Sequence, residues 1–286
     1  MELIKRIKTY SKLVMMSHTL FSLPFALLAM LIAAKGLPSF WKILWIAVAL
    51  FGARNGANAQ NRLIDRHIDK KNERTKNREI PAGKVSVKET VFLIVFFYAL
   101  FVLAAFMLNT LCLILSPVAI LLFSLYSYTK RYTYLCHYIL GFICAGAPVG
   151  AWIAITGTIA LTPFLIAAAV MFWVAGFDII YALSDIEHDK KEGLYSIPSR
   201  FGYQKASLIS SASHFLMVCF LISVTFFTEL GWLYLSGIGI CVILLVIEHI
   251  LVLPSSESKM KFVSYTINQY ISAVVLLFAV FDIFLI

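Results

Sequence analysis

Nine apolar segments, each about as long as a bilayer is thick, constrain this chain more than any other feature of its sequence. A helix needs about 20 predominantly apolar residues to cross the hydrocarbon core of a membrane. Such segments occupy residues 14–34, 39–63, 87–108, 110–129, 135–156, 161–184, 205–227, 231–252 and 264–286. Turn-forming residues such as Pro38, Asn109, Gly157 and Pro254 separate them. The pattern predicts an all-α integral membrane protein with nine transmembrane helices.

Composition agrees with a membrane protein and argues against a soluble enzyme. Only 14% of the residues are charged, against about 25% in a typical soluble domain. We therefore expect residues 1–286 to form a single membrane domain, without a cleavable signal peptide. The net charge of +9 favours anionic headgroups or phosphates as partners over nucleic acid, because the chain has no basic soluble module. The five cysteines lie in apolar segments without metal-ligand spacing, and we expect them to be packing residues.

The distribution of lysine and arginine predicts the orientation in the membrane. If the N-terminus is cytoplasmic, 21 of these cations fall in cytoplasmic segments and two on the opposite side. This asymmetry is the one that multi-pass proteins of a cell (inner) membrane show. Both long polar loops, at about residues 66–86 and 187–204, then face the cytoplasm, and any active site in them faces it as well.

A polar helix face leads from the second apolar segment into the first of these loops. It consists of Arg54, Asn58, Asn61, Asp65 and Asp69, which follow one another at intervals of four, three, four and four residues. This spacing places all five on one side of a helix. Because charged groups are costly inside a membrane, such a face is a candidate functional site.

A second polar face leads into the other cytoplasmic loop. Its members Asp178, Tyr181, Asp185 and Asp189 are spaced by three, four and four residues. Asp185 follows Asp65 by 120 residues, and Asp189 follows Asp69 by 120 residues. The similar layout indicates two weakly repeated halves.

Two pairs of carboxylates suit one particular chemistry. Magnesium prefers a few carboxylates, with waters and phosphate oxygens as its other ligands. Two facing pairs can therefore hold a diphosphate and neutralise the charge that develops as it leaves. Four basic residues can complete such a clamp, namely Arg74, Arg78, Lys130 and Arg131. With apolar helices to enclose a hydrocarbon and many aromatic residues to stabilise a cation, the pattern favours allylic prenyl transfer.

Each motif also has a purely structural interpretation. A single pair of acids four residues apart is usually a solvated helix end. Arg54 can extend its guanidinium to the membrane surface or pair with an acid. His18, near the start of the first segment, fits core packing as well as cavity lining. The occurrence of two acidic pairs, each continued by polar residues into a helix, is what favours function.

The combined motifs resemble the UbiA superfamily of intramembrane prenyltransferases. Its first signature, NDxxDxxxD, is matched by Asn61-Arg62-Leu63-Ile64-Asp65-Arg66-His67-Ile68-Asp69, and its second, similar to YxxxDxxxD, by Tyr181, Asp185 and Asp189. Arg74-Thr75 with Arg78, Pro81-Ala82-Gly83 and the run from Tyr126 to Thr133 add further matches. The resemblance covers nearly the whole chain.

The resemblance implies a bundle of nine helices around a central cavity, and it implies roles for the polar residues. Asp65, Asp69, Asp185 and Asp189 would be catalytic and would bind magnesium together with Asn61. Arg74, Arg78, Lys130 and Arg131 would contact the diphosphate, whereas Arg54, Asn58, Asp178 and Tyr181 would bind the acceptor. The substrates would be a polyprenyl diphosphate and an aromatic acid, 4-hydroxybenzoate above all, on the way to ubiquinone or menaquinone.

One departure from the family's pattern bears on the acceptor. Arg62 stands where the family often has aspartate, and the resulting NRxxDxxxD pattern is similar to a bacterial branch of 4-hydroxybenzoate polyprenyltransferases. Members of that branch also resemble enzymes proposed to prenylate a dihydroxynaphthoate in menaquinone synthesis through futalosine. Haem and chlorophyllide are other acceptors within the superfamily.

Two alternatives lie outside the superfamily. A transporter would carry its acids near the middle of the bilayer, whereas these acids lie at the predicted cytoplasmic ends of helices. A CDP-alcohol phosphotransferase would carry a DGxxAR signature, which the sequence lacks.

Overall fold

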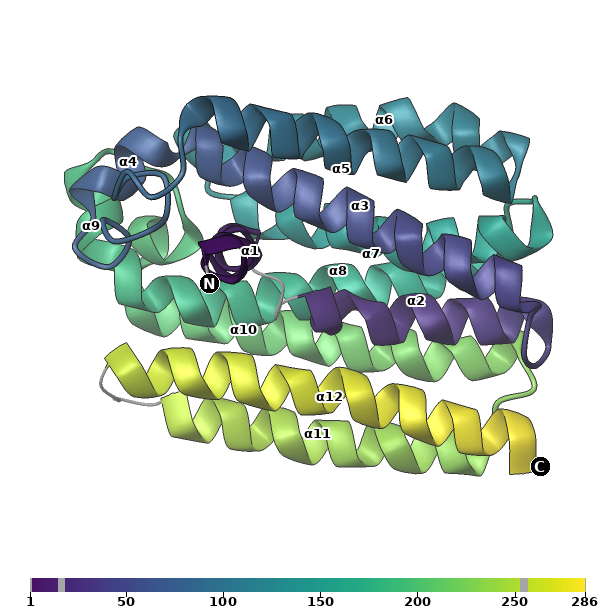
Figure 1. Cartoon of the computed structure of the whole chain (residues 1–286). Coiled ribbons are helices and arrows are strands. Elements are labelled where there is room, and N and C mark those ends of the chain that lie inside the picture. The colour runs from purple at the N-terminus through teal and green to yellow at the C-terminus, as the bar shows by residue number, and fades with distance from the viewer. Residues whose placement is uncertain (1, 15–18, 253–256, 286) are drawn as a thin grey trace. The chain divides into compact units, whose positions relative to one another are not determined.

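The computed structural model describes residues 2–14, 19–252 and 257–285 (Figure 1). All regular secondary structure in these residues is helical, which confirms the all-α prediction. The longer helices are α1 (Glu2–Leu13), α2 (Thr19–Ala34), α3 (Phe40–Ile64), α5 (Val87–Leu108), α6 (Thr110–Tyr126), α7 (Cys136–Thr156), α8 (Leu161–Ala182), α10 (Ile197–Val224), α11 (Trp232–Val252) and α12 (Glu257–Leu285). Short helical elements are α4 (Arg66–Lys71), η2 (Thr129–Arg131), η3 (Leu183–Asp185), α9 (Ile186–Lys191) and η4 (Thr225–Phe227).

Within the described residues, seven helices are long and apolar enough to cross a membrane. They include α5, α6, α7, α8, α10, α11 and the part of α12 from Thr266, and they correspond to the predicted segments from 87–108 onward. The two earlier segments differ from these. Helix α2 contributes a shorter apolar stretch, Leu23–Ala34, and α3 is 25 residues long but becomes polar toward its end. The number of nine spans therefore stays a prediction, and His18 lies outside the described residues.

The chain divides into two compact units. Unit 1 comprises Met1–Thr19 and Phe40–Tyr128, and unit 2 comprises Leu20–Ser39 and Thr129–Ile286. The prediction of a single domain around a central cavity, with two repeated halves, stays a prediction.

In unit 1, helices α3 and α5 pack so closely that their contact requires a small residue. A Cβ atom added at Gly52 of α3 would lie 2.7 Å from the carbonyl oxygen of Phe97 in α5. Small residues permit such close approach in membrane bundles, where lipid is as apolar as the helices. Asn109 separates α5 from α6, because its side-chain oxygen accepts a hydrogen bond from Cys112 N and so begins the next helix. The predicted boundary at Asn109 is confirmed.

Unit 2 has an apolar core with a buried polar connection. Trp173 of α8 is fully buried and packs on Phe25 of α2, with the ring centroids 5.1 Å apart. Its Nε1–H donates to Asn268 Oδ1 of α12 (2.6 Å), and Asn268 Nδ2 donates to Glu248 Oε1 of α11 (2.8 Å). Helices α11 and α12 run side by side (Figure 1). These bonds fix α8, α11 and α12 to one another, because unpaired polar groups are expensive inside a membrane.

The second polar loop is shorter than the predicted range of 187–204. Helix α9 continues to Lys191 and α10 begins at Ile197, so residues 192–196 are the non-helical connection. Ser196 caps α10, and Pro198 lies in its first turn, where the fixed backbone angle of proline suits a helix start. The helix then bends at Gly202, whose φ of 76° is non-helical. The first loop, 66–86, begins with α4 and continues as turns to Ser86.

Candidate functional site

The first acidic helix end lies where α3 passes into α4. Asp65 interrupts the helix, with φ −87° and ψ 2°. The helical hydrogen bonds nevertheless continue across it, because Asp65 N donates to Asn61 O (2.9 Å) and Asp69 N donates to Asp65 O (2.8 Å). Asn61 Nδ2 also donates to Asp65 Oδ2 at 3.2 Å. The local structure thus brings Asn61 and Asp65 together, as their spacing predicts.

The polar loop folds back onto Asp69. Arg78 Nη1 donates to Asp69 Oδ1 at 2.6 Å, and Thr75 Oγ1 donates to the backbone oxygen of Asp69 at 2.9 Å. The Asp69 side chain is 8% exposed. Its second oxygen, Oδ2, is buried and has no hydrogen-bond partner among the described residues. Arg78 therefore fixes the carboxylate by one oxygen and leaves the other as a candidate cation ligand.

The other predicted site residues of unit 1, Asn58, Arg54 and Arg74, are all partly buried. Asn58 Nδ2 donates to Val14 O at 2.8 Å and so ties the end of α1 to α3. Arg54, one turn earlier, is half-buried in the same helix. Arg74 is half-buried in the loop, where its backbone N–H donates to Asn72 Oδ1 at 2.8 Å in a side-chain turn.

The second acidic helix end lies in unit 2, where α8 passes through η3 into α9. Asp185 and Asp189 are 5% and 2% exposed. Ser196 Oγ donates to Asp189 Oδ2 at 2.7 Å and accepts a hydrogen bond from Ser199 N at 3.2 Å. One serine thus caps α10 and fixes a buried carboxylate.

Lys130 lies close to these acids. It interacts electrostatically with Asp189, Asp178 and Asp185. Its backbone oxygen accepts a hydrogen bond from Tyr195 N at 2.8 Å, which holds η2 against the connection between α9 and α10. Lys130 is therefore a predicted basic residue that interacts with the acids of unit 2. Arg131, its neighbour in η2, is half-buried, as is Tyr181 in α8.

Sequence reasoning missed His137 and Ser196. His137, in the first turn of α7, lies 2.7 Å from Asp178 Oδ2 through its Nδ1 and is fully buried. Its partner is 41 residues away, so no helical spacing could indicate the pair. Ser196 could have been found as a helix-start signal, because it stands two residues before Pro198.

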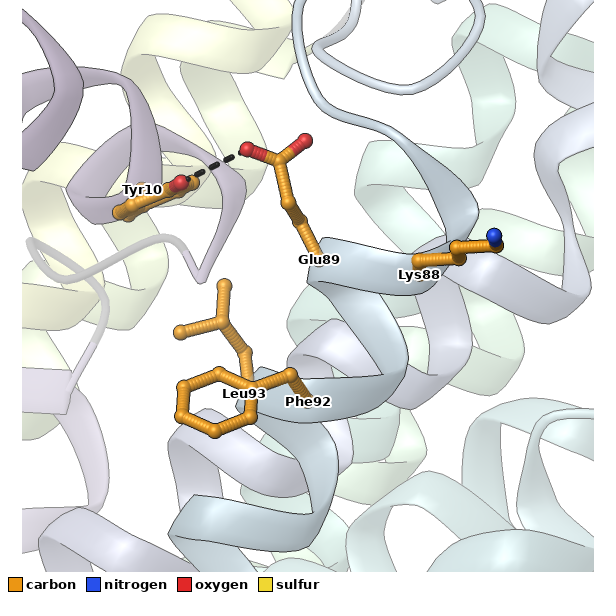
Figure 2. A pocket seen from close by; sticks show the side chains of 5 residues that line it. All are labelled: Tyr10, Lys88, Glu89, Phe92 and Leu93. Carbon is orange, nitrogen blue, oxygen red and sulfur yellow. Dashed lines mark hydrogen bonds between the residues drawn. The ribbon is translucent and has the colours of Figure 1, made fainter.

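A surface hollow of about 340 Å³ lies elsewhere in unit 1, at the start of α5 (Figure 2). Its lining residues are Tyr10, Lys88, Glu89, Phe92 and Leu93. Glu89 is engaged there, because Tyr10 and Arg6 each donate to its Oε1 at 2.9 Å. The hollow contains none of the predicted site residues, and Glu89 serves to hold α1 on α5.

Carboxylates are the predicted metal donors at both acidic helix ends. In the described ranges, no three His, Cys, Asp or Glu side chains lie together so that they could hold a metal ion. Each acidic helix end carries two carboxylates, whose oxygens are the predicted metal ligands. Oxygen donors of this kind suit magnesium, which commonly completes its coordination with water and phosphate.

Comparisons with known proteins agree with one another. Residues 22–275 match the sequence profile of the UbiA prenyltransferase family. A 4-hydroxybenzoate octaprenyltransferase of Shewanella pealeana is 31% identical over 241 residues, which are 83% of this chain and 83% of that protein.

Solved structures have the same fold. A UbiA homologue from Aeropyrum pernix K1 superposes with a TM-score of 0.85 at 30% identity, over 93% of this chain and 98% of that one. A UbiA homologue from Archaeoglobus fulgidus bound to GPP and Mg²⁺ superposes with a TM-score of 0.67 at 21% identity, over 93% and 99% of the two chains.

Proposed function

The chain belongs to the UbiA prenyltransferase family, and from this premise we propose that it transfers a polyprenyl group from polyprenyl diphosphate to an aromatic acid, 4-hydroxybenzoate in the first instance. The observation that carries the proposal is a pair of acidic helix ends, each with a buried carboxylate fixed by a dedicated partner. Arg78 fixes Asp69, and Ser196 fixes Asp189. Fixed carboxylates with little exposure suit a site that must bind the same ligand geometry repeatedly.

Both acidic ends are proposed to act on one diphosphate. Asn61, Asp65 and Asp69 would hold magnesium at the first end, and Asp185 and Asp189 at the second. Magnesium bound there would neutralise charge on the departing diphosphate. The Mg²⁺ and GPP bound to the A. fulgidus homologue support this choice of ion and donor class, as does the buried, unpartnered Asp69 Oδ2 among the described side chains.

The basic residues bind the diphosphate and the acceptor. Arg74, Arg78, Lys130 and Arg131 would contact phosphate oxygens through charge-assisted hydrogen bonds. Arg54 would bind the acceptor's carboxylate, because a guanidinium can donate to both of its oxygens at once. Asn58, Asp178 and Tyr181 would complete the acceptor site.

The proposed transfer breaks one bond at the allylic carbon and forms one. The allylic C–O bond breaks, and diphosphate leaves with the electron pair. A ring carbon of the acceptor, made electron-rich by the ring hydroxyl, forms the new C–C bond to the allylic carbon. That ring carbon then releases its proton to water, which restores aromaticity. The product is a lipid-soluble quinone precursor, in keeping with a protein of the cell membrane whose active site faces the cytoplasm.

A product assay tests this function. Purified protein is given polyprenyl diphosphate with 4-hydroxybenzoate or with a dihydroxynaphthoate, and products are identified by mass spectrometry. We expect prenylated 4-hydroxybenzoate and one diphosphate per product, with both lost on chelation and restored by magnesium. If only the dihydroxynaphthoate is prenylated, it replaces 4-hydroxybenzoate as the proposed acceptor. Arg62 in the first motif is compatible with that alternative. Absence of any prenylated acid would contradict the function, and uptake of substrate into proteoliposomes would instead support a transporter.

A further inference from the structure

The contact between His137 and Asp178 joins α7 to α8 in unit 2. Nδ1 of His137 lies 2.7 Å from Oδ2 of Asp178, a distance typical of a hydrogen bond to a charged group. The carboxylate accepts, so the Nδ1 atom carries the hydrogen. The histidine side chain is 0% exposed, whereas that of Asp178 is 23% exposed. The buried imidazole therefore supports a carboxylate that a ligand can reach.

Among the described residues, the contact with Asp178 is the bond of His137 to a carboxylate. Its Nε2 atom is buried without a hydrogen-bond partner there. A histidine that served only to fill space would leave two buried polar atoms to be satisfied, and such atoms are costly when unpaired. A side chain with one specific bond to a carboxylate is better explained by what it does to that carboxylate.

Asp178 lies close to the acids that are proposed to hold magnesium. Lys130 interacts electrostatically with Asp178 as well as with Asp185 and Asp189. Asp178 is in α8 itself, seven residues before Asp185. A carboxylate at that place is suited to accept a hydrogen bond from a substrate hydroxyl, because a carboxylate has only acceptors to offer.

We propose that His137 is a positioning residue that orients the Asp178 carboxylate to accept a hydrogen bond from the ring hydroxyl of the aromatic acceptor. The inference rests on the proposed function and deepens it, because it identifies a residue on which recognition of the acceptor, and not of the diphosphate, depends. Aspartate has two side-chain torsions, and the bond from Nδ1 fixes both. Without it the carboxylate loses one of the contacts that orient it, and binding of the hydroxyl weakens.

Two substitutions separate this role from simple packing. Asparagine carries an N–H group at the δ position, where His137 has Nδ1, whereas glutamine carries it one atom further out. His137→Asn should therefore keep the bond to Asp178, and His137→Gln and His137→Leu should lose it. As a matched control, His214→Asn changes another buried histidine of unit 2, whose Nδ1 bonds to His249 Nε2 at 3.0 Å and not to a carboxylate.

The measurement is KM for each substrate, with the acceptor that the wild-type protein prenylates. We expect His137→Gln and His137→Leu to raise the acceptor KM about tenfold or more, the usual effect of losing a hydrogen bond to a charged group. His137→Asn should stay within about threefold of wild type, and KM for polyprenyl diphosphate should change less than about twofold in every variant. His214→Asn should alter neither KM.

Two outcomes would contradict a positioning role for His137. If His137→Asn is impaired as strongly as His137→Gln, or if both substrates lose affinity equally, His137 has no positioning role. If His137→Leu fails to fold, the comparison of His137→Asn with His137→Gln still tests the positioning role. A wild-type protein that prenylates neither 4-hydroxybenzoate nor a dihydroxynaphthoate overturns the proposed function, whereas normal prenylation without the variant pattern overturns this inference alone.

Discussion

Asp69 is held by one of its two carboxylate oxygens. Arg78 takes Oδ1 at 2.6 Å, and the pair is largely buried, with side-chain exposures of 8% for Asp69 and 27% for Arg78. Burial makes such a pair sensitive to the loss of one partner, because the remaining charge is left without compensation. The function of Asp69 should therefore depend on a residue nine positions away, in a loop.

Arg78→Ala should lower prenyl transfer and raise the magnesium concentration needed for half-maximal rate. A charge-assisted hydrogen bond contributes about 1.5–3 kcal/mol, which corresponds to a loss of roughly tenfold to a hundredfold. Titration of the initial rate with magnesium measures both effects. Arg78→Lys should retain part of the activity, since it keeps the charge but not the planar fork.

Lys76 provides the control in the same loop. It pairs with Glu73, and both side chains are exposed, so Lys76→Ala should leave the rate and the magnesium dependence unchanged. If Lys76→Ala and Arg78→Ala have equal effects, the loop matters through its overall charge, and the specific role of Arg78 is wrong.

Helical spacing can predict which site residues are neighbours within one helix, but not which residues of other elements contact the acids. Helical spacing places Asn61 beside Asp65, and their hydrogen bond confirms that pairing. The partner of Asp178 comes from another helix, and that of Asp189 from the cap of α10. Contacts between elements depend on packing, which the period of a single helix does not contain.

Two helices of this protein begin with a serine N-cap of the same geometry. Ser86 at the start of α5 and Ser196 at the start of α10 each accept a hydrogen bond from the third residue of the helix, at 3.2 Å in both cases. Each serine also donates to a carboxylate at 2.7 Å, Glu89 for Ser86 and Asp189 for Ser196. The two caps are alike in geometry, but only Asp189 belongs to the proposed magnesium site.

This similarity provides a matched pair of substitutions. Ser86→Ala and Ser196→Ala should each reduce stability by about 1 kcal/mol through loss of the cap, which thermal unfolding in detergent would detect. Ser196→Ala should in addition lower prenyl transfer about tenfold, because Asp189 loses its hydrogen bond. Equal activity of the two variants would show that the bond from Ser196 to Asp189 has no part in the reaction.

Most helices could be predicted from the sequence, and the start of α10 is an exception. Segments from 87–108 onward were recognised because continuous apolarity is a strong signal. The start of α10 was not, because its first turns carry Arg200 and Lys205 and follow a basic run, which is typical of a loop.

The two acidic helix ends have one further similarity, since each long helix is followed by a six-residue helix with a buried aspartate, Asp69 in α4 and Asp189 in α9.

At the scale of the whole molecule, the distribution of cations predicts the topology. If the predicted nine spans are correct, the N-terminus lies in the cytoplasm and the C-terminus outside, with 21 cations on the cytoplasmic side and two on the other. Alkaline phosphatase fused after Ile286 should therefore be active, and a fluorescent protein fused at the same place should be dark. The reverse result would place the C-terminus in the cytoplasm and contradict nine spans with a cytoplasmic N-terminus.

Packing of whole helices was beyond the reach of sequence reasoning. The contact of α7 with α8 depends on Gly141, where an added Cβ would lie 2.2 Å from the carbonyl oxygen of Met171. A glycine in an apolar segment is common, and nothing in its neighbours indicates which helix will cross it. The sequence therefore predicts which segments are helices but not how the helices contact one another, and the roles of the site residues stay predictions.

We propose that the two acidic helix ends act on one diphosphate, and a double-mutant cycle tests this proposal most directly. Asp65→Asn, Asp185→Asn and the double variant are compared by kcat/KM for polyprenyl diphosphate at saturating acceptor. We expect each single change to cost about a hundredfold or more, and the double variant to lose much less than the product of the two, because residues that act as a unit are not additive. Near wild-type turnover of either single variant, or losses that multiply in the double variant, would contradict a shared diphosphate site.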